Sequence, residues 1–396
     1  MGSRAALPSR ARRRFALLAA ALAAVLASGA GGLTAMADEA TDTPSTSADP
    51  RPLACGDGSY DAEVTRNGNT WNAPGYSGSS MLEAMRAGVA SLTPGRTSME
   101  SVVVRGSGDV PANQSLDLPS HTSLEVCGTL NVTGQMAATH APIRVRNAQN
   151  VAIPYVENMH GAPYFGIFVQ NAHNVAMGDI TMELNGGLGI RVDNHGNTSQ
   201  RTTNVSIDSA TISGAGSHAV ETYGVDGFTA GTITASSVGE SGLLLNDTIN
   251  ANIGTIRATD VASGTGYAAF RMANRNGALN NYSTNIRVGE VIARGGGRGI
   301  FCVSQSGGAV IDRVDIADTG NNAILIENCY NVTIASQGGT ISGGGEVRLA
   351  ARTEFANNRD ITLRGFTLVN SRLTENPCGE NVTINITFQN STDNSC

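Results

Sequence analysis

Side chains capable of acid–base chemistry gather between residues 191 and 275 of this 396-residue chain. An arginine can neutralise a carboxylate and so make a neighbouring C–H bond more acidic, and a nearby tyrosine, histidine or arginine can then remove the proton. Two carboxylates can instead divide the acid and base roles of glycoside cleavage, or hold a calcium ion. The candidate catalytic residues are Arg191, Asp193, His195, His218, Glu221, Tyr223 and Arg271, and the candidate substrate-binding residues are Phe168, Asn246, Asp247, Arg275 and Phe301.

A repeated stretch of sequence must position these residues. Short segments with alternating apolar residues recur from about Pro142 to Arg352, and their starts are 23 to 30 residues apart. Such a period is typical of a solenoid, whose units bury their apolar face only by stacking. Most copies continue through Asn and a short turn into a second alternating strand, which predicts a parallel β-helix. The copies begin at Pro142, Gly166, Gly189, Ala219, Gly242, Ala269, Gly299, Ala323 and Glu346.

Within a copy, the second and fourth residues are apolar and the third and fifth are mixed, so the two sets point to opposite faces. Strands stack about 4.8 Å apart, so Arg191 should lie beside Glu221, and Asp193 beside Tyr223. Asp193 and Glu221 are then diagonal neighbours with Cα atoms roughly 8 Å apart, which suits either glycosidase geometry. The third position forms the column Arg144, Phe168, Arg191, Glu221, Leu244, Arg271, Phe301, Leu325 and Arg348, and the fifth forms Arg146, Gln170, Asp193, Tyr223, Asn246, Ala273, Val303, Glu327 and Ala350.

A helix is predicted ahead of the coils. Ser80 and Glu83 form a capping box, and Leu82, Met85 and Val89 then lie on one helical face. Such a helix would cover the open end of the solenoid, where unpaired strand edges invite association. A capping helix followed by coils of about two dozen residues resembles the pectin-lyase-like superfamily. The resemblance implies an all-β, single-stranded right-handed parallel β-helix with an N-terminal capping helix.

The resemblance covers nearly all of the mature chain, but only at the level of the fold. The superfamily includes polysaccharide lyases, polygalacturonase-type hydrolases, fructotransferases, epimerases and non-enzymatic fibres. The chain lacks the Asp-Asp pair and the Gly-His-Gly of polygalacturonases and the Arg-x-Pro-x-x-Arg of common pectate lyases, and it contains no lysine for an Arg-Ile-Lys motif. The fold therefore assigns no catalytic residue.

Three functions fit the outward columns. In a polysaccharide lyase, Arg191 and Arg271 would neutralise a uronate carboxylate, and Asp193 and Glu221 could hold an assisting calcium ion. In a glycoside hydrolase or transglycosylase, Asp193 would share the acid and base or nucleophile roles with Glu221 or Asp247. In a glycan-binding or fibre protein nothing turns over. For each residue there is also a purely structural alternative, in which Arg191 and Glu221 form a surface ion pair and the histidines are turn residues. Aromatic planes for sugar rings could come from Phe168, Phe301, Tyr164 and Tyr267.

The arginines interspersed on this face of an acidic chain favour the lyase. Residues 1–37, with a basic start, an Ala/Leu run and a small-residue cleavage site, are typical of a secretory signal. Without them, 21 arginines face 33 acidic residues, a formal charge of −12. This charge argues against nucleic acid or a membrane as partner, and a polysaccharide is the expected substrate. The expected divisions are the signal peptide (1–37), a flexible linker (38–53), a cap region with the helix (54–115) and the β-helix with a C-terminal cap (116–396).

Six cysteines in an exported chain indicate disulfides. Proximity favours the pairs Cys55 with Cys127, Cys302 with Cys329, and Cys378 with Cys396. No Cys-x-x-Cys or His-rich spacing supports a metal site in their place.

Overall fold

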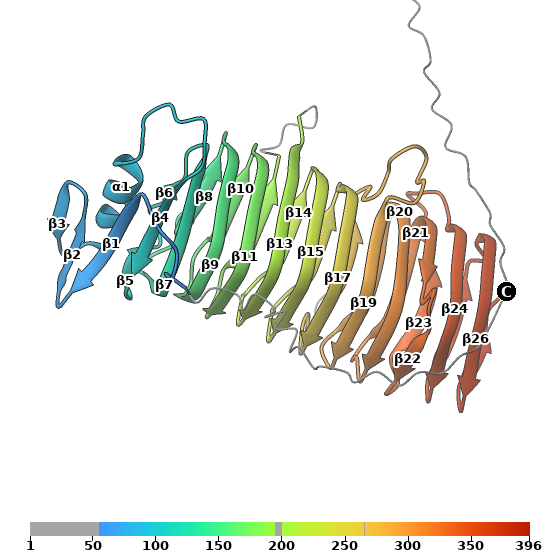
Figure 1. Cartoon of the computed structure of the whole chain (residues 1–396). Helices are drawn as coiled ribbons and strands as arrows, with labels where there is room; N and C mark the ends of the chain where they lie inside the picture. Colours follow the sequence, from blue (N-terminus) through green and yellow to red (C-terminus); the bar gives the residue numbers. More distant parts are fainter. Residues whose placement is uncertain (1–54, 195–199, 265) are drawn as a thin grey trace, which may run out of the picture. The chain divides into compact units, whose positions relative to one another are not determined.

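The computed structural model describes residues 55–194, 200–264 and 266–396, and this part of the chain is almost entirely β-structure (Figure 1). It is a parallel β-helix with an N-terminal helix, as predicted. Within the described ranges, no helix combines the length and the apolar character that crossing a membrane would require.

One face of the solenoid, here called the front sheet, carries the predicted columns. Its strands are short except for β20 and β21, and each pairs in parallel with the next. In order they are β6 (Leu116–Asp117), β8 (Ile143–Arg146), β10 (Phe165–Gln170), β12 (Leu188–Asp193), β14 (Val220–Tyr223), β16 (Leu243–Asn246), β18 (Phe270–Ala273), β20 (Arg298–Ala317), β21 (Asn322–Ile334), β23 (Glu346–Ala350), β25 (Arg372–Asn376) and β27 (Thr392–Asn394).

A second run, the back sheet, completes each coil, and β20 and β21 are long enough to pass through both runs. Asparagines with positive φ make the turns between the two runs, and the Nδ2 of Asn171 donates to the Oδ1 of Asn147 one coil away at 2.7 Å. The remaining strands of the back sheet are β7 (Thr122–Thr133), β9 (Gln149–Gly161), β11 (His173–Leu184), β13 (Thr202–Ser213), β15 (Val225–Ser236), β17 (Ile249–Thr259), β19 (Ile286–Arg294), β22 (Gly339–Ser342), β24 (Arg359–Val369) and β26 (Glu380–Gln389).

The core is filled by the second and fourth residues of each repeat. Ile190 and Val192 on β12 are completely buried, as are Ile324 and Ile326 on β21. Thr222 on β14 is a polar exception, and its hydroxyl lies 2.8 Å from that of Thr248 inside the stack. Because each buried residue contacts its counterparts on the adjacent coils, removal of apolar surface from water fixes the register of the stack.

The N-terminal end is covered by α1 (Met81–Ala90), whose N-cap residue Ser80 accepts a hydrogen bond from the N–H of Glu83 at 3.3 Å. The helix buries Leu82 and Met85 as the capping box and periodicity predict. Parallel pairing begins ahead of Leu116, since β1 pairs with β4 and β4 with β7. The strands of this region are β1 (Ala62–Asn67), β2 (Thr70–Ala73), β3 (Tyr76–Gly78), β4 (Glu100–Arg105) and β5 (Gly108–Pro111).

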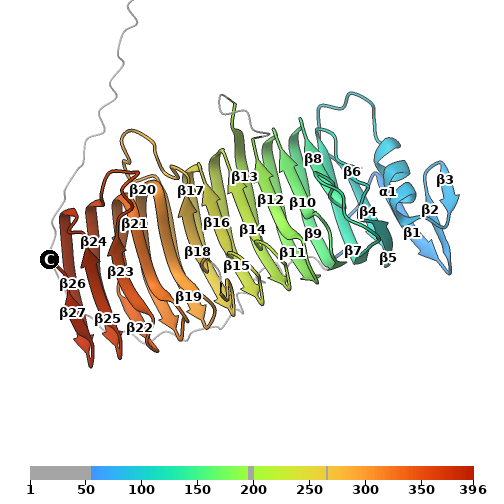
Figure 2. The same cartoon turned by 180° about the vertical axis from the view of Figure 1, so that it is seen from behind.

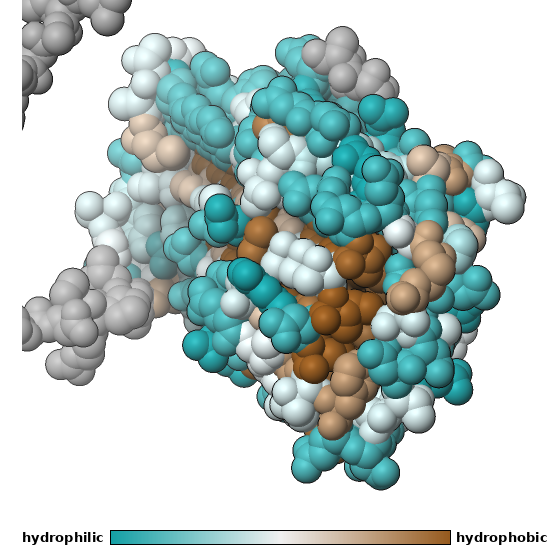
Figure 3. Space-filling view, turned by 90° about the vertical axis from the view of Figure 1, so that its right-hand side faces the viewer, coloured by the Kyte–Doolittle hydropathy of each residue, from teal (hydrophilic) through white to brown (hydrophobic). Residues whose placement is uncertain are grey.

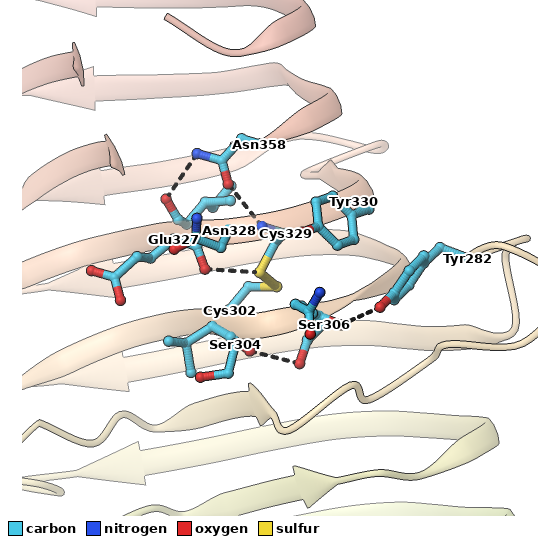
Figure 4. Close-up of a disulfide and its surroundings, with 12 residues drawn as sticks. Tyr282, Cys302, Ser304, Ser306, Glu327, Asn328, Cys329, Tyr330 and Asn358 are labelled. Carbon is cyan, nitrogen blue, oxygen red and sulfur yellow. Dashed lines mark hydrogen bonds between the residues drawn. A yellow bond between two sulfur atoms is a disulfide. The ribbon is translucent and has the colours of Figure 1, made fainter. Parts of the chain in front are cut away.

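All three predicted disulfides are present: Cys55 with Cys127, Cys302 with Cys329, and Cys378 with Cys396. The second joins neighbouring coils on β20 and β21 (Figure 4). The side-chain oxygen of Asn358 accepts the N–H of Cys329 at 2.9 Å, so the turn beside this bridge is also fixed by hydrogen bonds.

No helix of the described residues covers the C-terminal end. Along β26 every second residue is apolar and only partly buried, and Figure 3, which faces this end of the solenoid, shows an apolar surface inside a hydrophilic rim. These side chains, which pack on the last coil, are Val382, Ile384, Ile386 and Phe388.

Candidate functional site

The front sheet brings the predicted columns together. Arg191 on β12 lies opposite Glu221 on β14, and Asp193 lies opposite Tyr223 in the same two strands. The third-position column continues through β16 to Arg271 on β18. These strands lie side by side in Figure 2. The predicted alignment of these rungs is therefore confirmed.

Arg191 binds two carboxylates. Its guanidinium forms a close ion pair with Glu221, and its Nε lies 3.3 Å from the Oδ2 of Asp193. The Nδ2 of Asn246 donates to the Oε1 of Glu221 at 2.9 Å, and the Nδ2 of Asn274 donates to the Oδ1 of Asn246 at 3.0 Å. The ion pair expected between Arg191 and Glu221 is present, but it is largely buried and does not lie at the surface. Because Arg191 is already neutralised by two acids, it does not serve as a free cation for a substrate carboxylate.

Glu221 is the buried acid of this network, with 8% of its surface exposed. Burial raises the pKa of its carboxyl, because a charge is poorly solvated there, and Arg191 and the hydrogen bond from Asn246 offset this only in part. A raised pKa is one property of a general acid, but the close ion pair with Arg191 favours the charged form of this carboxyl.

His218 is engaged through both ring nitrogens. Its Nδ1 accepts the N–H of Ser241 at 2.9 Å, so its Nε2 carries the proton and donates to the Oε2 of Glu240 at 3.0 Å. Burial, and then Arg271 and Arg191, lower the pKa of His218 to about 3. His218 therefore positions Glu240 and the turn at Ser241, and this geometry does not fit its expected role as a proton-removing base.

Arg271 lies on β18 among aromatic rings, its side chain hydrogen-bonds Tyr267, and Glu240 and Glu221 attract its charge. Its Cζ lies 4.6 Å from the ring centroid of Tyr267 and 5.2 Å from that of Phe301. Its buried Nε has no hydrogen-bond partner among the described residues, although buried donors are normally paired. Arg298 stacks on the same Phe301 ring at 4.9 Å. Burial lowers the pKa of Arg271 and of Arg298, and repulsion from Arg271 lowers the pKa of Arg298 further, so an anion here would relieve the repulsion.

A cleft lies where β14, β16 and β18 end, and three predicted residues line it. Its volume is about 640 Å³. Arg201 Nη2 lies 2.7 Å from the Oδ1 of Asp247, and Asn274 links the cleft to the network around Glu221. The lining residues are Tyr223, Asp247 and Arg275, with Arg201, Asn274, Ser304, Gln305 and Phe355.

The two phenylalanines do not offer open faces for sugar rings. Phe168 is 1% exposed and packs on Phe165 with ring centroids 4.6 Å apart, and Phe301 is 8% exposed between arginines. Both contribute to packing, and their predicted role in substrate binding stays a prediction. Tyr164, 37% exposed, is the large aromatic residue of the predicted set that remains open to solvent.

The carboxylates of Asp193 and Glu221 do not fit a calcium ion while Arg191 is in place. The guanidinium contacts an oxygen of each, and its positive charge would repel a divalent cation. His195 lies outside the described residues.

Two residues of the cluster, Glu240 and Arg298, were not predicted as catalytic or binding groups, and Tyr267 was predicted only as an aromatic plane for a sugar ring. Glu240 and Tyr267 lie in the turns before β16 and β18, and Arg298 is the first residue of β20, so all three are one or two residues ahead of the aligned repeats. His218 occupies the equivalent place before β14, so extending the repeat alignment upstream by two residues would have placed all of them at one end of the front sheet.

Comparisons with protein families and with curated proteins found no match. Among solved structures, the A-module of mannuronan C-5 epimerase AlgE6 from Azotobacter vinelandii is similar at 14% identity with a TM-score of 0.44, over 79% of this chain and 93% of that one. The AlgE4 A-module from the same organism has 11% identity and a TM-score of 0.37, over 74% and 88% of the two chains. The receptor binding domain of the Siphovirus 9NA tailspike has 12% identity and a TM-score of 0.34, over 79% and 74%. Similarities this low do not bear on what the chain does.

Proposed function

We propose that this protein is a secreted carbohydrate-active enzyme that cleaves a uronate-containing polysaccharide by β-elimination. The observation that carries the proposal is the orphaned Nε of Arg271, held between the rings of Tyr267 and Phe301. A carboxylate matches a guanidinium in charge and in planar geometry. Such a local site can attract a uronate to a chain that is acidic as a whole.

The reaction needs a neutralised carboxylate and a proton acceptor. Arg271 and Arg298 would neutralise the carboxylate and acidify the proton on C5 of the uronate. The acceptor removes that proton, the bond between C4 and the glycosidic oxygen breaks, a C4–C5 double bond forms, and the departing oxygen takes up a proton. Tyr267 and Tyr223 are the candidate acceptors, because each ring lies against a guanidinium, that of Arg271 and that of Arg191 respectively.

Paired-carboxylate hydrolysis is the second candidate function. It is favoured by Glu221, whose pKa is raised by burial in a strand adjacent to that of Asp193. The close ion pair between Arg191 and Glu221 argues against hydrolysis, because it favours the charged carboxylate of Glu221. A general acid must carry a proton that it can donate to the leaving oxygen. A protein that only binds glycans is the third candidate.

The disulfide bonds of the chain support export. The three disulfides are typical of oxidising compartments. The expected signal at residues 1–37 would deliver the protein to such a compartment.

A substrate screen tests the proposal. The purified mature protein is incubated with acidic and neutral polysaccharides, with calcium and with chelator, and both new reducing ends and the ultraviolet absorption of an unsaturated uronate are followed. We expect both signals on at least one uronate polymer. New reducing ends without the ultraviolet absorption would establish hydrolysis instead. Absence of both signals on every polymer would favour a protein that binds glycans without cleaving them.

A further inference from the structure

A basic groove lies beneath the capping helix, at the N-terminal end of the front sheet. Its volume is about 820 Å³. Four arginines and a single acid line it, on a partly apolar floor. The charged residues are Arg86, Arg96, Arg144, Arg146 and Asp117, and the floor includes Val89, Leu92, Leu116 and Leu118.

Protein contacts hold two of these guanidiniums in place without using all their donors. Arg144 binds both oxygens of Asp117, at 2.5 and 2.9 Å. Arg96 donates from its Nε to the carbonyl of His121 at 2.9 Å and from its Nη1 to the carbonyl of Thr93 at 3.2 Å. A guanidinium has five N–H donors, so each retains some for a ligand. The arrangement resembles a pre-organised anion site, because the cations are fixed before a ligand arrives.

The groove belongs to the same face as the candidate site. Arg144 and Arg146 occupy the third and fifth positions on β8, in register with β10 and through it with β12. A smaller hollow of about 350 Å³ shares Ser120, Asn147 and Ala148 with the groove and extends to Gln200.

The next residue after Gln200, Arg201, lines the cleft at Tyr223 and Asp247. The hollows therefore follow one another along the ends of the front-sheet strands, from the cap toward the cleft. The middle hollow is lined by hydroxyl, amide and imidazole groups that suit sugar hydroxyls, including those of Asn171 and His173.

We propose that the basic groove is a remote subsite for a second, non-reacting stretch of the same acidic polysaccharide. This inference rests on the proposed function for the identity of the polymer. From β8 to β18 there are five strand steps, or about 24 Å, so a chain that reaches both the groove and Arg271 must be several sugar residues long. The enzyme should therefore favour long over short substrates, through binding energy gained away from the reacting bond.

Binding can be tested separately from turnover. Retention of the mature protein is measured by affinity electrophoresis in gels that contain polygalacturonate or alginate, with dextran as the neutral polymer. Arg146→Glu is the main variant, because Arg146 is exposed and its replacement should leave the fold intact. Arg348→Glu is the matched control, an exposed arginine at the far end of the same sheet. We expect Arg146→Glu to weaken retention on one acidic polymer about tenfold, with the difference reduced by salt, and Arg348→Glu to leave it unchanged.

Three results would overturn the subsite. Arg146→Glu and wild type could be retained equally on both acidic polymers, or Arg348→Glu could weaken retention as much as Arg146→Glu does. The third is wild-type retention that is no stronger on either acidic polymer than on dextran. Arg271→Ala separates the two proposals. If Arg271→Ala is retained on the acidic polymer while Arg146→Glu is not, the groove binds anionic glycan. This conclusion holds even if no uronate polymer is cleaved. Where turnover is detected, Arg146→Glu should raise KM on polymer and leave kcat/KM on the shortest cleaved oligomer unchanged.

Discussion

His218 shows how its surroundings set the role of a residue that the sequence marks as reactive. Its Nδ1 accepts from the main chain and its Nε2 donates to Glu240, so the neutral ring is part of the scaffold. The repeat alignment places the histidine directly before the Ala219 strand. Its partner Glu240 belongs to the next coil, so the repeat that contains His218 does not reveal the pair. Burial and pairing are products of stacking and could not be predicted from one repeat.

The depressed pKa of His218 gives a pH prediction. Its folded-state value of about 3 lies below the ordinary 6.5, so between these values the unfolded chain binds a proton that the folded chain excludes. This contribution to stability is complete above about pH 6.5 and is lost as the pH falls toward 3. Arg191 and Arg271 oppose protonation of the ring, and Glu240 is the acid that faces it.

His218→Gln keeps an acceptor and a donor but cannot titrate. Between about pH 6.5 and 4 the unfolding free energy of wild type should fall more steeply than that of the variant, by up to about 1.4 kcal/mol per pH unit. Denaturant titrations at several pH values measure the difference. Parallel curves for the two proteins would contradict the assignment of a buried neutral histidine.

At the level of strands, alternation predicted both register and direction. The apolar second and fourth positions had to face the core, and the pairing of Arg191 with Glu221 followed from stacking alone. The alternation did not predict which groups pack over an outward-facing side chain. Phe168 and Phe301 point away from the core yet are buried, because Phe165 and the arginines beside Phe301 pack over them. These covering groups lie outside the strand positions that the repeat aligns.

The alternation itself can be tested on β12. Val192→Asp places a carboxylate in the completely buried stack and should lower the unfolding free energy by about 3 kcal/mol or more, because the charge has no partner there. Asp193→Asn keeps the shape of the side chain and removes one ion pair with Arg191, whose side chains are 18% and 13% exposed, so it should cost only about 1 to 2 kcal/mol. Equal losses in a denaturant titration would show that the assignment of the two faces is wrong.

Across the described coils, three features share the front sheet: the basic groove, the cleft and the partly buried pair Arg271 and Arg298. The position of Arg271 in a column of polar residues could be read from the repeat. Its orphaned Nε could not, because this depends on Tyr267 from the preceding turn and Phe301 from the next strand. An acidic chain that concentrates arginines along one face is suited to an anionic polymer, since local potential rather than net charge governs the encounter.

Arg271 is therefore the residue on which the proposed lyase most depends. The decisive measurement is the rate at which unsaturated uronate absorption appears on the polymer that the wild type cleaves, for Arg271→Ala, for Arg271→Lys and for Arg348→Ala as the matched arginine control. With folding verified by an unchanged unfolding midpoint, we predict that Arg271→Ala lowers kcat/KM at least about a hundredfold, because the transition-state charge on the carboxylate loses its partner. Arg271→Lys should recover only part of this rate, since an ammonium lacks the planar fork, and Arg348→Ala should match wild type. Wild-type rates in a folded Arg271→Ala protein would contradict carboxylate neutralisation at this site.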